Sequence, residues 1–208
     1  MPKSSSTLAE NLARRFRTIE LSRFRLEELA ARGLLPQRTA TQMYEGVFLS
    51  SQVSFEAFLE QLFIGLLLEG QGVQSERHDV VPRIVVRSHS IVRELLTTRQ
   101  RQYVDWFPYE RTTELAEKYF RGGRPFCDLS DSEKQHLSKC HTIRNVIAHD
   151  SRDSRMKFEK RVLGNTPLPP HERSPAGYLR GLYRTAPAQT RYENFIAQLL
   201  LIARKLAK

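Results

Sequence analysis

Apolar positions recur every three or four residues over most of this chain, which is the spacing of an amphipathic α-helix. In the first segment, Leu8, Leu12, Phe16 and Ile19 form such a stripe, and the helix is expected to end at Gly33. The pattern predicts helices over residues 6–32, 39–69, 91–106, 111–120, 130–149 and 191–207. Strand signals are confined to residues 80–81 and 84–86. The sequence therefore predicts an all-α fold.

The second predicted helix, residues 39–69, differs from the others because its second half is apolar around most of its circumference. A helix with no polar face is expected to be deeply buried or to form the seam of a dimer. The Gly-containing residues 70–82 that follow are expected to be a loop.

Residues 151–190 are the least regular part of the chain. They are strongly charged at first, and the prolines that follow forbid a continuous helix, namely Pro167, Pro169, Pro170, Pro175 and Pro187. We expect a basic, Pro-rich insertion here that is a loop or a mobile excursion. Residues 1–36 are expected to be an N-terminal helical extension and residues 37–208 the main helical domain.

The amino-acid composition indicates a class of binding partner. The chain has 208 residues, enough for one sizeable core, and a formal net charge of +10, with 25 arginines against 8 lysines. Arginine favours phosphate recognition, because its planar guanidinium binds phosphate oxygens in pairs. Nucleic acid is the partner that this balance indicates. The alternative is a basic surface that only aids solubility.

Candidate metal ligands and membrane segments are sparse. The set Cys127, His136, Cys140 and His141 matches no familiar zinc spacing, so packing is the better explanation and neither metal nor cofactor is expected. The first residues lack the apolar stretch of a secretory signal, and the longest apolar run is far shorter than a bilayer span. A cytoplasmic protein without membrane contact is expected.

The end of the fifth predicted helix carries the candidate chemistry. Ser130 and Glu133 form a candidate capping box at its start, and Arg144, Asn145 and His149 lie near its end. Four residues lie between Arg144 and His149, so the two are five positions apart, which places them about 140° apart on a helix. Asn145 shares a face with His149 and is a candidate to orient it. The helix C-terminus and Asp150 would both favour imidazolium, which suits a proton shuttle.

The run Arg144-Asn-Val-Ile-Ala-His149, at the end of a helix of about 20 residues, resembles the Arg-x4-6-His motif of the HEPN superfamily, including its RiboL-PSP type. Residues 53–63 resemble an early core helix of those domains. The resemblance implies a metal-independent endoribonuclease, with Arg144 binding phosphate and His149 acting as general acid and base. It also implies a homodimer with a composite active site, a role as toxin or defence effector, and an antitoxin or defence-system partner. Ser151 stands where some HEPN toxins carry a tyrosine that is adenylylated, so that form of control is not expected.

A non-catalytic interpretation of Arg144 and His149 is the alternative. His149 would then cap a helix, and Arg144 would pair with a carboxylate such as Glu56, which lies among Phe55 and Phe58. Such a pair could also fix the arginine for catalysis. The alternative function is therefore a helical module that binds RNA or a protein without turnover.

Overall fold

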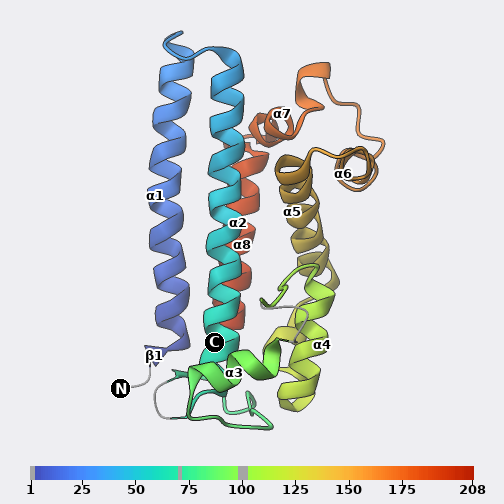
Figure 1. The fold of residues 1–208 in the computed structure, drawn as a ribbon. Coiled ribbons are helices and arrows are strands. Elements are labelled where there is room, and N and C mark those ends of the chain that lie inside the picture. The colour runs from blue at the N-terminus through green and yellow to red at the C-terminus, as the bar shows by residue number, and fades with distance from the viewer. Residues whose placement is uncertain (1–2, 70–71, 98–102) are drawn as a thin grey trace. The chain divides into compact units, whose positions relative to one another are not determined.

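The protein is all-α. The computed structural model describes residues 3–69, 72–97 and 103–208, and Figure 1 shows long helices with short connecting elements. The α-helices are α1 (Ser5–Ala31), α2 (Gln37–Leu67), α3 (His89–Leu96), α4 (Tyr109–Tyr119), α5 (Asp131–His149), α6 (Arg152–Phe158), α7 (Pro175–Arg180) and α8 (Arg191–Leu206). No helix among the described residues has the length and apolar character needed to cross a membrane.

Short elements complete the fold. The strands are β1 (Lys3–Ser4), β2 (Val73–Gln74), β3 (Leu182–Thr185) and β4 (Ala188–Thr190). β1 pairs with β2 in parallel, and β3 pairs with β4 as an antiparallel hairpin. Three 3-10 turns, η1 (Arg121–Gly123), η2 (Phe126–Asp128) and η4 (Pro170–Glu172), and a π-helical turn, η3 (Glu159–Leu163), lie between the helices. Of the predicted strand signals at residues 80–81 and 84–86, Val86 forms an isolated bridge with Leu68, and Pro82, which lies between the two signals, forms another with Phe120.

The contacts group the chain into two compact units. Unit 1 comprises Met1–Ala13, Phe55–Lys134 and Leu200–Lys208, and unit 2 comprises Arg14–Ser54 and Gln135–Leu199. The predicted division at residue 36 stays a prediction. Unit 2 holds the end of α5 and therefore the candidate chemistry.

The core of unit 1 is built around Phe63 on α2. Its ring lies 4.9 Å from that of Phe126, 5.0 Å from that of Phe120 and 5.2 Å from that of Trp106, measured between centroids. The neighbouring α2 residues 62–67 are all buried. Deep burial of the apolar half of α2 is thus confirmed, and this half serves the core of unit 1 rather than a dimer surface.

The core of unit 2 is an aromatic cluster in which α2 meets α8. Tyr192 lies edge-on to Tyr44 at 5.7 Å and to Phe48 at 6.4 Å, and its hydroxyl is 3.2 Å from that of Ser51. Arg23 on α1 is only 4% exposed, and its guanidinium packs over the Tyr192 ring. A buried cation needs carboxylate partners, and Arg23 has two, in Glu20 and Glu193.

The helix predicted over residues 91–106 is wrong in its extent. The structure has α3 ending at Leu96, and Thr97 adopts an extended conformation. Residues 98–102 lie outside the described residues, and 103–106 are not helical. Trp106 is buried against Phe63, and its carbonyl accepts a hydrogen bond of 2.7 Å from the Thr112 hydroxyl. Tertiary packing of one aromatic side chain therefore overrides the helical periodicity.

The predicted loop at residues 151–190 is also corrected. Ser151 caps α6 through a reciprocal capping box with Ser154, and Ser174 caps α7. Helical spacing buries Phe158 and Val162 on one face of α6 and η3. The prolines do interrupt the chain, but between short helices and a hairpin rather than within one long loop.

Candidate functional site

The candidate site stands at the C-terminal end of α5. The predicted capping box opens the helix, since the Ser130 backbone N–H donates to the Glu133 carboxylate at 2.7 Å and the Glu133 N–H donates to the Ser130 hydroxyl at 3.3 Å. His149 is the last helical residue, as predicted. Asp150 then takes a positive φ of 41°, and its N–H donates to the Val146 carbonyl at 3.1 Å. This left-handed residue ends the helix directly after His149.

Arg144 and Asn145 form a short polar chain along α5. Nη1 of the half-buried Arg144 donates to Oδ1 of Asn145 at 3.2 Å. Nδ2 of the same amide lies 2.9 Å from Nε2 of His141, one helical turn earlier. The amide thus bridges a guanidinium and an imidazole. Asn145 contacts His141 rather than His149, and sequence reasoning had considered His141 only as a zinc candidate.

His149 is exposed, and its side chain has no hydrogen bond or ion pair with any residue that the structure describes. Asp150 was expected to favour the imidazolium form of His149. Its carboxylate instead accepts from Nε and Nη2 of Arg155, each at 2.7 Å. This ion pair with Arg155 lowers the pKa of Asp150. The imidazole of His149 is therefore accessible to a ligand. The next residue along the chain, Asp150, is held in a bidentate ion pair with Arg155.

The other predicted supporting residue, Glu56, is half-buried on α2. It belongs to unit 1, whereas Arg144 belongs to unit 2. Their ion pair stays a prediction.

The zinc candidates have packing roles where their surroundings are described. Cys140 is fully buried, and burial raises the pKa of its thiol. The ring of His136 stacks on Phe195 at 4.8 Å, and its Nε2 lies 3.3 Å from the Phe195 carbonyl oxygen. Cys127, in unit 1, lies 3.8 Å from the Thr113 carbonyl oxygen. Among the described residues, no group of three or more potential ligands is placed to hold a metal ion.

A pocket opens against the end of α5. This α5–α6 pocket has a volume of about 420 Å³ and includes Val146 and Ile147 of α5, Phe158 of α6 and Pro175 of α7. Its polar lining includes Glu45 of α2, Asp150 and Arg155. The sequence could not reveal it, because four separate segments contribute to it.

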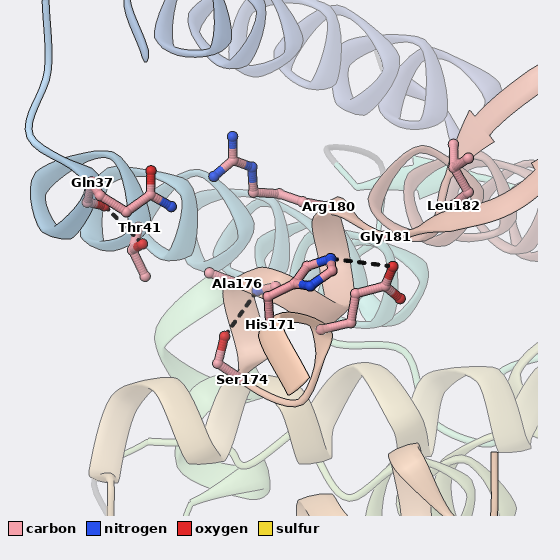
Figure 2. Close-up of a pocket in the computed structure, with 10 residues that line it drawn as sticks. Gln37, Thr41, His171, Ser174, Ala176, Arg180, Gly181 and Leu182 are labelled. Carbon is pink, nitrogen blue, oxygen red and sulfur yellow. Dashed lines mark hydrogen bonds and ion pairs between the residues drawn. The ribbon is translucent and has the colours of Figure 1, made fainter. Parts of the chain in front are cut away.

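A second pocket, of about 320 Å³, lies beside α7 and the first turns of α2 (Figure 2). Figure 2 shows Arg180 reaching from the end of α7 toward Gln37 and Thr41. Its guanidinium donates to Glu27 at 2.7 Å and packs over the Tyr44 ring. Glu172, also in the lining, accepts from Arg191 at 2.6 Å. The charged groups of Arg180 and Glu172 in this pocket are thus paired within the fold.

Comparison with protein-family models, with characterised proteins and with solved structures found no match to this chain. The resemblance to HEPN proteins therefore rests on the residues of α5 and α2 alone.

Proposed function

We propose that this protein is a metal-independent endoribonuclease whose active residues are Arg144 and His149. The observation that carries the proposal is the exposed imidazole of His149 at the end of α5, with Arg144 and the α5–α6 pocket on the same helix end. An accessible imidazole can move protons near neutral pH, and a guanidinium can hold a phosphate. The net charge of +10 supports a nucleic-acid partner.

The proposed reaction is attack of a ribose 2′-oxygen on the adjacent phosphorus. His149 removes the 2′-proton as the new P–O bond forms, Arg144 stabilises charge on the phosphate oxygens, and the P–O5′ bond breaks. Protonation of the 5′-oxygen completes the step. The products are a 2′,3′-cyclic phosphate and a 5′-hydroxyl, so no water or metal enters the reaction.

A second copy of the chain is part of this proposal. One imidazole does not serve as base and acid in the same step, and α5 is helical through both residues, so Arg144 and His149 point about 140° apart within one chain. A symmetric dimer would supply two copies of each group to one cleft. We further propose that the enzyme acts as a toxin or defence effector, as the HEPN resemblance implies.

The same divergence favours a second candidate function. If the chain acts alone, Arg144 and His149 do not converge, and Arg144 stays engaged with Asn145. The end of α5 would then belong to a module that binds RNA or a protein without cleaving it.

The chemistry is tested with an RNA oligonucleotide, digested by the full chain in excess EDTA. We expect products that end in 2′,3′-cyclic phosphate and 5′-hydroxyl groups. An oligonucleotide with a single 2′-deoxynucleotide at the cleaved position should resist cleavage there and be cut normally elsewhere. Cleavage at the deoxy position, or products with 3′-hydroxyl and 5′-phosphate ends, would rule out attack by the 2′-oxygen.

A further inference from the structure

The α5–α6 pocket has the volume of a small-molecule site, and its lining is mixed, with apolar and charged side chains. Its volume of about 420 Å³ falls within the range of known ligand pockets. Val146, Ile147, Phe158 and Pro175 supply apolar surface. Flat, apolar ring faces are the ligand surface that such walls accept most readily, because ring stacking and burial need no polar partner. A ligand with an apolar ring face and polar edges, such as a nucleobase, matches this mixed lining.

Two carboxyl groups of the lining, Glu45 and Glu159, have no ion pair among the described residues, and Glu45, on α2, is the one that is half-buried. Burial raises the pKa of Glu45, and a hydrogen bond from the Ala176 backbone N–H partly offsets this. An ionised carboxylate only accepts hydrogen bonds, and its two oxygens suit two adjacent N–H donors.

Among the common bases, guanine presents two adjacent donors, N1–H and the N2 amino group, on its Watson–Crick edge. Adenine and cytosine present one amino donor next to an acceptor, and uracil presents one N–H between two acceptors. A carboxylate at the pocket wall therefore pairs most completely with guanine.

Cations at the pocket complete a nucleotide site. Arg173 lines it, is exposed, and forms no ion pair within the described part of the chain. Arg155 also lines it, but its Nε and Nη2 already donate to the Asp150 carboxylate. Arg173 is thus the guanidinium available to a phosphate.

We propose that the α5–α6 pocket binds a guanine base of the RNA substrate, with Glu45 accepting from its Watson–Crick edge and Arg173 holding a phosphate. This inference rests on the proposed ribonuclease function and gives it a sequence preference, since the pocket shares the end of α5 with His149. Cleavage is then expected next to guanosine.

The test is equilibrium binding of GMP, AMP, CMP and UMP to the full chain in EDTA. We expect GMP to bind about tenfold more tightly than the other three, the discrimination typical of one bidentate contact to a base. Glu45→Gln should abolish the preference, because one of its two acceptors becomes a donor. Glu45→Asp, which keeps the acceptors but shortens the side chain, should weaken it. Arg173→Gln should weaken all four nucleotides alike.

Glu10→Gln, at an exposed position of α1, is the matched control and should leave the preference intact. Far-UV circular dichroism and thermal melting establish that each variant is folded. Equal binding of the four nucleotides by wild type, or a GMP preference that survives in folded Glu45→Gln, would overturn the proposal.

Mononucleotides contain no bond to be cleaved, so this result is independent of catalysis. Cleavage of RNA without a GMP preference would remove the guanine pocket alone. A GMP preference without any RNA cleavage would remove the ribonuclease proposal and leave the pocket as a guanine-nucleotide site.

Discussion

Arg144→Ala slows RNA cleavage by about 10²–10³-fold, the usual loss when one group that stabilises transition-state charge is removed. The expected loss is mainly in kcat, because the guanidinium is proposed to act on charge that builds during attack. Arg144→Lys keeps the charge but loses the planar fork that donates to Asn145, so it should restore only part of the rate. Single-turnover cleavage in EDTA measures both variants.

Arg161→Ala is the control for this prediction, because it removes an exposed guanidinium of unit 2 that is not on α5. Its cleavage rate should stay within a few-fold of wild type. Equal losses in Arg144→Ala and Arg161→Ala would mean that Arg144 acts only through the general positive charge of the surface.

Acidification should destabilise the protein through His136. Burial lowers the pKa of this imidazole to about 4, although its hydrogen bond to the Phe195 carbonyl opposes the shift. In the unfolded chain the same group binds a proton near pH 6.5, its ordinary pKa. Between these two values the unfolded state holds more protons, so stability is lost as the pH falls from about 6.5 to about 4.

The expected loss attributable to His136 is about 2 kcal/mol between pH 7 and pH 4.5. His136→Phe keeps a ring against Phe195 and removes the titration, so its free energy of unfolding should fall less over this interval by that amount. Urea unfolding at both pH values measures the difference. Parallel pH profiles for wild type and His136→Phe would show that the imidazole is not buried in its neutral form.

Local signals predicted α5 well, because both of its ends are encoded nearby. The Ser130–Glu133 box starts the helix through contacts three residues apart. The stop at His149 is likewise local, since Asp150 turns into the left-handed region. Asp and Asn are the residues after glycine that adopt this conformation most readily.

Side-chain partners were harder to predict than the helix that carries them. The contact of Asn145 with His141 follows the spacing rule for one helical turn, and that rule favoured His149 equally. Asp150 had two possible neighbours, and the charged fork of Arg155 on α6 took its carboxylate. That outcome depends on α6, which was not predicted, because the high charge and the prolines of residues 151–190 indicated a loop.

The hydrophobic periodicity of the sequence could predict neither the α5–α6 pocket nor the position of Trp106. Trp106 leaves the predicted helix because its ring packs against Phe63, more than 40 positions away in the sequence. The α5–α6 pocket likewise combines Glu45 of α2 with residues of α5, α6 and α7. Contacts between such distant segments follow from the tertiary fold, and no local pattern encodes them.

The most direct test of the central claim is digestion of a mixed RNA pool in EDTA by wild type, His149→Ala and His171→Ala. His171 is the matched control, because it is also an exposed histidine of unit 2. We expect wild type and His171→Ala to produce 2′,3′-cyclic phosphate ends at similar rates, and folded His149→Ala to lose about 10²–10⁴-fold of that activity. Equal cleavage by all three proteins, or no cleavage by a folded, dimeric wild type, would contradict the assignment of His149 as the catalytic residue of a ribonuclease.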